Sequence, residues 1–223
     1  VRQAVSYAID YDGVAQRVMA GHAVTPPSMI ATGLLGADSI PPLKRDLAKA
    51  KALLAEAGYP NGVELTAVYP NFTRDGVDVN VLAQKIQADL AEAGIKLQLV
   101  PQENTVYLAD YRAGKLAMVI AGWTTDYPDP QATATVFAGS NGNAMKRMHA
   151  TSPENDKLLA QAVATANQEE RKATYAKILK NIQDEANFVS VVLPKQNIGY
   201  RTDIQGMRFH QLVKVPFADL SRT

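Results

Sequence analysis

The amino-acid sequence predicts an α/β fold in which a mixed, mostly parallel sheet is flanked by helices. Apolar strand patterns alternate with helical patterns in the middle of the chain, an order typical of parallel strands joined by right-handed helical crossovers. The 223 residues are 47% hydrophobic and 20% charged, which is ordinary for a folded domain. The alternating segments are the strand Val63–Tyr69, the helix Val77–Ala93, the strand Ile95–Val100, a helix from Asn104 to about Ala113, and the strand Ala117–Trp123.

Helical patterns also open the chain. Val1–Asp10 carries its apolar residues on one helical stripe, and Tyr11–Met19 predicts a second short helix. The following segment, His22–Arg45, is rich in proline and glycine, and an irregular stretch of this length tends to wrap a neighbour or border a site. Asp46 then predicts the start of a helix that ends near Ala57, either as its N-cap or as an acid in its first turn.

Local chemistry sets the boundaries in the central part of the chain. Asn104 predicts the N-cap of its helix, because its short polar side chain can accept from a free backbone amide. Ala117–Trp123 is apolar almost throughout, as expected of a strand buried on both faces of a sheet. After it, Asp129-Pro130 predicts an N-cap and the first position of a short helix near Ala132–Phe137.

The last third of the chain predicts two more helices and a strand. A Ser-Pro pair at 152–153 begins the first helix, since proline suits the first helical position. Asn167 and Glu170 predict a capping box for a helix that ends near Ala186. Phe188–Leu193 is apolar enough to predict a final core strand, and the remainder has no strong periodicity.

Several kinds of chemistry lack their usual sequence signature. The chain has no cysteine, and a net charge of +1 gives no field that attracts nucleic acid, so no nucleic-acid partner is expected. Neither a glycine-rich phosphate loop nor a G-x-S-x-G elbow occurs, and no apolar run reaches the ~18 residues of a membrane span. The histidines, His22, His149 and His210, lack metal-ligand spacing. We therefore predict no catalytic residue, metal or cofactor.

The most informative stretch runs from Trp123 through Thr124, Thr125 and Asp126 to Tyr127. It follows the predicted strand directly, and ligands of open α/β sheets bind outside the carboxyl ends of the strands. The two aromatic rings offer rigid contact area, and the hydroxyl groups can orient polar ligand atoms. Asp126 adds a carboxylate that could hold an ammonium group. We predict that these five residues bind a ligand.

A structural interpretation competes with this one at Trp123 and at Asp126. Trp123 taken alone is more often a core plug, and Asp126 could equally cap a turn. Asp129 is better explained as the helix cap, which weakens the idea that Asp126 and Asp129 form a carboxylate pair for hydrolysis. The sequence thus separates the two acids into a ligand candidate and a structural cap.

Segments along nearly the whole chain resemble one known family, in the family's own order. Together they are similar to the C-terminal lobe of the dipeptide/oligopeptide-class (family 5) extracytoplasmic solute-binding proteins of ABC importers. The segments that carry the resemblance are Val1–Asp10, Ala48–Gly62, Gly122-Trp123 with Asp126–Pro130, Ser152–Leu159, and Gln168–Ile182 with Arg171 and Tyr175.

The resemblance implies a periplasmic-binding-protein-like (type II) lobe that comprises residues 1–223 as a single domain. The N-terminal lobe of such a protein is then absent from this chain and is its partner across the cleft. In peptide-binding members, the acid at the position of Asp126 pairs with the ligand's α-amino group, while Trp123 and the two residues after it line the cleft. Some members have arginine where this chain has Ile120.

The resemblance also implies a non-enzymatic role: periplasmic capture of a peptide or similar small solute for delivery to a membrane permease. Other members of the family take nickel complexes, haem, sugars or opines. Two further readings stay open at this stage. One is an α/β hydrolase-like enzyme that uses Asp126 with a second acid or a histidine, and the other is an interaction domain built around the loop His22–Arg45.

Overall fold

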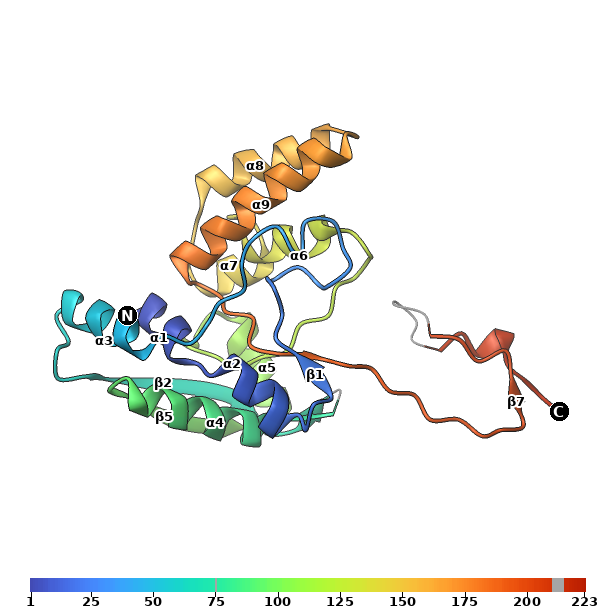
Figure 1. Ribbon diagram of the computed structural model, residues 1–223, viewed down its shortest axis with the longest axis horizontal. Helices are drawn as coiled ribbons and strands as arrows, with labels where there is room; N and C mark the ends of the chain where they lie inside the picture. Colours follow the sequence, from blue (N-terminus) through green and yellow to red (C-terminus); the bar gives the residue numbers. More distant parts are fainter. Residues whose placement is uncertain (75, 210–214) are drawn as a thin grey trace.

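The computed structural model describes residues 1–74, 76–209 and 215–223 of the chain. Figure 1 shows two layers, one formed by a sheet with the N-terminal helices and the other by helices α6 to α9. Each layer has its own cluster of buried apolar side chains. The C-terminal part leaves the layers as an extended arm (Figure 1).

The centre of the first layer is a pair of parallel strands. β2 (Val63–Pro70) and β5 (Ile95–Gln102) are in register along their whole length. Helix α4 (Val79–Glu92) connects them, and α5 (Asn104–Arg112) follows β5. This arrangement confirms the predicted α/β fold with a parallel sheet and flanking helices.

A short third segment extends the sheet on the other side of β2. Val68 and Val119 form a single parallel bridge, in which the Val68 amide donates to Met118 O at 3.0 Å and the Ile120 amide donates to Val68 O at 3.1 Å. β2 is therefore central, whereas no strand among the described residues pairs with the outer edge of β5. The chain passes from β2 to β5 on one side and then back across β2 to the Val119 segment on the other side. Right-handed crossovers in these two opposite directions place α4 and α5 on opposite faces of the sheet.

The N-terminal helices pack on α4. Helix α1 (Arg2–Ala8) leads into the single turn α2 (Tyr11–Gly13) and the π-helical turn η1 (Val14–Val18). The predicted helix Tyr11–Met19 is thus present, although most of it has π geometry. Helix α3 (Leu47–Glu56) packs on α1, and the Asp46 carboxylate accepts from the Lys49 amide at 2.9 Å, which confirms the predicted cap.

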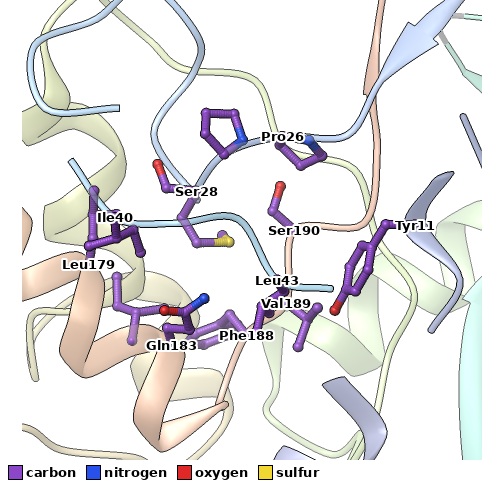
Figure 2. A pocket seen from close by; sticks show the side chains of 13 residues that line it. Tyr11, Pro26, Ser28, Ile40, Leu43, Leu179, Gln183, Phe188, Val189 and Ser190 are labelled. Atoms are coloured by element: carbon purple, nitrogen blue, oxygen red, sulfur yellow. The ribbon is translucent and has the colours of Figure 1, made fainter. Parts of the chain in front are cut away.

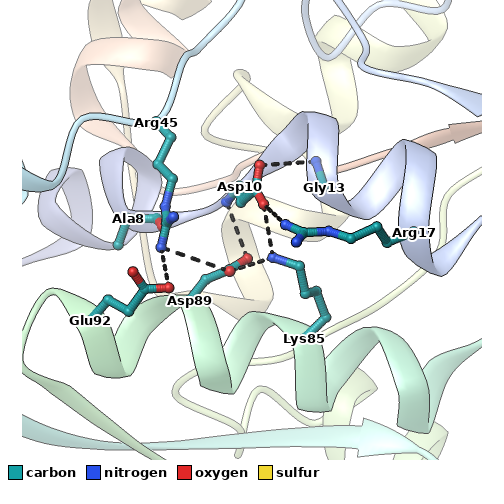
Figure 3. Close-up of polar contacts among 8 residues, drawn as sticks. All are labelled: Ala8, Asp10, Gly13, Arg17, Arg45, Lys85, Asp89 and Glu92. Carbon is teal, nitrogen blue, oxygen red and sulfur yellow. Dashed lines mark hydrogen bonds and ion pairs between the residues drawn. The ribbon is translucent and has the colours of Figure 1, made fainter.

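A network of charged side chains fixes the junction of α1 and α2 on α4 (Figure 3). The Asp10 carboxylate accepts from the Gly13 amide at 2.9 Å and from Lys85 Nζ at 3.2 Å, and it also pairs with Arg17. Asp89, which is only 3% exposed, accepts from the Asp10 amide at 3.1 Å and pairs with Lys85. These contacts join residues about 75 positions apart in the sequence.

The long segment between β1 (Ala23–Val24) and α3 has no regular secondary structure, as predicted. It crosses from the first layer to the second, where Ile30 and Ala37 are buried among the helices. A side chain contact ties it back to the end of α9, because Gln183 Nε2 donates to Pro41 O at 3.3 Å. The segment therefore wraps a neighbour, which is one of the two roles expected for it.

The second layer is a group of packed helices with a buried apolar centre. Tyr175, Ile178 and Leu179 lie at that centre and are almost fully buried. Asn167 caps the longest helix, accepting from the amides of Glu169 at 3.0 Å and Glu170 at 3.3 Å. The helices are α6 (Pro130–Phe137), α7 (Asn143–Arg147), α8 (Pro153–Ala164) and α9 (Gln168–Glu185).

Three expectations about single elements are wrong. Ala117–Trp123 is not a strand, because only the bridge at Val119 forms and residues 121–123 are exposed. Phe188–Leu193 is not a strand either: only its last residue pairs, within β6 (Leu193–Pro194), which is antiparallel to β1. The cap of α5 is Glu103, whose carboxylate accepts from the Thr105 amide at 2.8 Å. Asn104 is instead the first helical residue.

The remaining elements are short. The hairpin of β3 (Thr73–Arg74) and β4 (Val77–Asp78) follows β2, and the C-terminal arm carries β7 (Ile204–Gln205), the 3₁₀ turn η2 (Phe217–Asp219) and β8 (Ser221–Arg222), with β7 and β8 antiparallel. His210 lies outside the described residues. Within the part of the chain that the structure describes, no helix has both the length and the apolar character needed to cross a bilayer.

Candidate ligand-binding site

The candidate site lies where the order of strands changes. β5 and the segment around Val119 both follow β2 in sequence, but they lie on opposite sides of it in the sheet. In open α/β sheets this is the point at which a crevice forms outside the carboxyl ends of the strands. The chain leaves the sheet there after Ile120 and runs through the predicted ligand residues to α6.

Trp123 is half exposed, with 43% of its surface open to solvent. Its indole ring meets the ring of Phe137 edge to face, at a centroid distance of 5.4 Å and an interplanar angle of 90°. Phe137 in turn meets Phe188 at 5.1 Å and 74°. Trp123 is therefore not the core plug of the structural interpretation: its ring is held at one side and open on another.

Thr124 is exposed and receives a hydrogen bond from another part of the sheet layer. Arg74 Nη2, on the β3–β4 hairpin, donates to Thr124 Oγ1 at 3.3 Å. The aliphatic part of the same arginine runs past Gly122, where a β-carbon would lie 3.6 Å from Arg74 Cδ. The hairpin thus brings a guanidinium group to the candidate site.

The sequence pattern alone does not single out Arg74. The signal was the position of its hairpin, because Thr73 and Arg74 follow the carboxyl end of β2 just as Trp123 follows that of the neighbouring segment. Carboxyl ends of parallel neighbours meet at one edge of a sheet, so polar residues after both are brought together.

Thr125 and Tyr127 form a local turn. Thr125 Oγ1 donates to Tyr127 O at 2.9 Å, and the Asp129 amide donates to the same carbonyl oxygen at 2.8 Å. The Tyr127 side chain is 43% exposed. One of the two hydroxyl groups expected to face a ligand is therefore engaged in shaping the loop, while the tyrosine ring stays open to solvent.

Asp126 projects from this turn as an exposed residue. No hydrogen bond or ion pair to its carboxylate is present among the residues that the structure describes. It does not cap the turn, because the turn is closed by Thr125 and by backbone groups. Its negative charge is thus free to interact with a molecule outside the chain.

Asp129, three residues later, has every feature of a structural residue. Its carboxylate accepts from the Gln131 amide at 2.9 Å and so caps α6. The same carboxylate accepts from Arg171 Nη2 on α9, at 3.0 and 3.1 Å. Burial would lower the pKa of Arg171, but the interactions with Asp129 and Tyr175 together outweigh it and raise that pKa. The prediction of a helix cap is confirmed.

The arrangement has the chemistry of a binding surface. A carboxylate, a guanidinium group and two half-exposed aromatic rings lie on segments that end at one edge of the sheet, and such a set recognises small polar molecules with apolar parts. The nearby basic residues belong elsewhere: Arg147 lies over the Tyr111 ring at 4.6 Å, and His149 Nε2 is 2.9 Å from Gly114 O. No cluster of three metal-ligating side chains occurs within the described ranges.

The fold and the candidate site at its edge are those of an α/β module suited to ligand binding. Residues 1–145, well over half of the chain, match the family described as bacterial extracellular solute-binding proteins, family 5 Middle. The chain belongs to this family, which is a family of substrate-binding proteins. The match includes α1, the sheet and the segment from Trp123 to Tyr127.

Relatives of known name agree with this membership. The chain is 32% identical to heme-binding protein A of Haemophilus influenzae over 200 residues, covering 86% of the chain and 36% of that protein. It is 29% identical to the dipeptide-binding protein of Escherichia coli over 227 residues, covering 99% of the chain and 42% of that protein. The chain therefore spans about two fifths of the length of these relatives.

Solved structures show the same fold. The periplasmic binding protein DppA of Helicobacter pylori, in complex with the peptide STSA, aligns with a TM-score of 0.86 and 27% identity, covering 99% of this chain and 43% of that one. HbpA2 of Haemophilus parasuis aligns with a TM-score of 0.81 and 26% identity, covering 100% of this chain and 44% of that one.

Proposed function

We propose that this chain forms one wall of the binding cleft of a solute-binding protein that captures peptides or similar small solutes and delivers them to the permease of an ABC importer. The exposed, unpartnered carboxylate of Asp126 is the observation that carries the proposal. In the proposed complex it holds the ligand's ammonium group, while Trp123, Thr124, Thr125 and Tyr127 line the surface around it.

The surroundings of Asp126 favour a zwitterionic ligand. A charge-assisted hydrogen bond contributes about 1.5–3 kcal/mol net, provided that both partners lose little other solvation. Arg74, beside Thr124, supplies a positive charge on the neighbouring segment and is suited to a ligand carboxylate. Arg74 could hold the ligand carboxylate, for which some family members have an arginine at the position of Ile120. A short peptide has both charges, with apolar side chains for the aromatic rings.

Haem is the second candidate ligand. The observation in its favour is the similarity to heme-binding protein A. Its propionates would suit Arg74, whereas its macrocycle has no ammonium group for Asp126. The peptide proposal therefore accounts for more of the site, and the two differ in what they require of Asp126.

The family is one of substrate-binding proteins, which supports a role in binding, and we propose that this chain likewise binds its ligand without catalysing a reaction. The hydrolase alternative needs a second acid or a histidine near Asp126, but Asp129 is held by Arg171 and His149 by Gly114 O. Release of bound peptide in unchanged form supports our proposal. Turnover that is lost in Asp126→Asn would favour the enzyme instead.

Compartment and partners follow from the same proposal. An extracytoplasmic location, in the periplasm, is supported by the family description, which is of extracellular solute-binding proteins. The partners would be the ligand, the second lobe that faces it, and a membrane permease. Mass spectrometry of material that co-purifies with the full-length protein identifies the ligand class directly.

Substitution of Asp126 is the sharpest test. Asp126→Asn in the full-length protein keeps the shape of the residue and removes its charge, so we expect affinity for the dipeptide Met-Leu to fall about 10- to 100-fold, the equivalent of ~1.5–3 kcal/mol. Glu56→Gln, an exposed acid on α3, is the matched control and leaves affinity unchanged. Unchanged affinity of Asp126→Asn by calorimetry removes this residue from the site.

A further inference from the structure

Three aromatic rings connect the candidate site to the interior of the helical layer. Trp123 lies on an exposed loop, Phe137 ends α6, and Phe188 follows α9. Each meets the next edge to face, at 5.4 Å between the first pair and 5.1 Å between the second. Phe137 is 8% exposed and belongs to the buried cluster, so it joins the half-exposed Trp123 to the core of the helical layer.

We propose that Phe137, supported by Phe188, is a positioning residue that sets the orientation of the Trp123 indole toward the ligand. This inference rests on the proposed function, in which Trp123 lines the cleft. It adds a residue that touches no ligand, and that neither the sequence pattern nor the family match assigns to the site.

The backbone alone does not fix the indole. Residues 121–125 have neither helical nor strand hydrogen bonding, so the loop leaves the side chain several staggered orientations. An edge-to-face ring pair restricts them, because the attraction depends on the angle as well as the distance between the rings. At 90°, Phe137 occupies one side of the indole and leaves the rest of the ring available.

Phe188, unlike Phe137, lies beside a cavity. The cavity is between the two layers and is lined mainly by apolar side chains of both (Figure 2). Tyr11 and Leu43 contribute from the sheet layer, and Leu179 and Ile182 contribute from α9. A smaller residue at position 188 would enlarge this cavity and give Phe137 room to tilt. Phe188→Leu is therefore expected to act like Phe137→Leu, but less strongly.

Fluorescence tests the inference without a ligand, because Trp123 is the only tryptophan of the chain. In the 223-residue chain, Phe137→Leu keeps apolar bulk and removes the ring. We expect a red shift of the emission maximum and an increase of about 1.5- to 2-fold in quenching by acrylamide as the indole loses its neighbour. Ile178→Val, in the same buried cluster, is the control: it lowers the melting temperature and leaves the emission unchanged.

Binding of Met-Leu to the full-length protein is the second readout. We expect Phe137→Leu to weaken affinity about 2- to 10-fold, the range given by one aromatic pair, and Ile178→Val to leave it unchanged. Emission that moves no more in Phe137→Leu than in Ile178→Val overturns the inference. So does altered emission with unaltered affinity. If the unmodified protein binds neither Met-Leu nor other short peptides, the proposed peptide function fails, while the fluorescence still decides whether Phe137 orients Trp123.

Discussion

Asp126 and Asp129 lie three residues apart and have opposite surroundings. Asp129 is surrounded by donors from α6 and α9, whereas Asp126 meets none among the described residues. An acid whose charge is already neutralised has little left to offer a ligand, and an acid without a partner contributes little to folding. Substitution of Asp129 should therefore change the stability of the fold, and substitution of Asp126 should change the affinity for the ligand.

Replacement of Asp129 should destabilise the chain. Asp129→Ala removes the cap of α6, which costs about 1 kcal/mol, and leaves Arg171, with 15% of its side chain exposed, without its carboxylate. We expect a loss of ~2–4 kcal/mol in the free energy of unfolding, from urea denaturation. Asp126→Ala is the internal control and should stay within ~0.5 kcal/mol of the original chain. Equal losses at both positions would contradict this division.

The sequence predicts that Asp129 caps a helix, but it does not predict the ion pair with Arg171. The Asp-Pro pair gives the local role because capping involves only neighbouring residues. Its ion pair with Arg171 joins residues 42 positions apart, and no local pattern reports such a contact. The same limit explains why Arg74 was missed. Residue roles that depend on a distant segment become visible only in three dimensions.

At the scale of elements, the helices followed their local signals better than the strands. Helix α3 begins after Asp46 and α9 after Asn167, as their caps predict. The strand predicted at Ala117–Trp123 failed because a strand also needs a partner along its length, and only Val119 finds one. The apolar run instead supplies the partly buried Met118 and the buried Ile120 to the core and then becomes an open loop. That loop is what exposes Trp123.

The junction of α1, α2 and α4 should make stability depend on pH through Asp10. Burial alone would raise the pKa of Asp10, but the Gly13 amide and the charges of Lys85 and Arg17 outweigh it and lower the pKa below its ordinary value of 3.8. A carboxyl group with a lowered folded-state pKa stabilises the fold above the unfolded-state value. That contribution is lost as the pH falls through the folded-state value.

Asp10→Asn tests this linkage. We expect the substitution to cost ~1–3 kcal/mol at pH 7, because a charged partner of Gly13 and Lys85 is lost. Between about pH 5 and pH 2 the original chain should lose more stability than the variant, so the difference between them shrinks. Urea denaturation at several pH values provides the comparison, with Asp12→Asn as a control in the same turn. A difference that stays constant over this range would contradict the role of Asp10.

At the scale of the whole molecule, the chain is much shorter than the named relatives that it matches. It spans 36% and 42% of the two named relatives, yet two separate apolar clusters give it a core of its own. The candidate site lies at an exposed edge of the sheet layer. In the proposed complex, the second lobe covers Asp126 and Trp123 from the open side.

The 223-residue chain should therefore bind ligand weakly. We expect its affinity for Met-Leu to be at least ~100-fold lower than that of the full-length protein, because about half of the contacts are missing while the entropic cost of association remains. Calorimetric titration of both proteins under the same conditions makes the comparison. Comparable affinities would mean that this chain carries a complete site and that the proposed second lobe is not needed for binding.

The outer edge of β5 has a consequence for how the chain behaves at high concentration. A strand with a free edge is a template on which another molecule can add its own strand, which is the first step of edge-to-edge aggregation. In β5, Pro101 lacks an amide hydrogen and Lys96 is exposed, and both features oppose such addition. The outer strand of the sheet is in this way guarded against joining two copies of the protein into one continuous sheet.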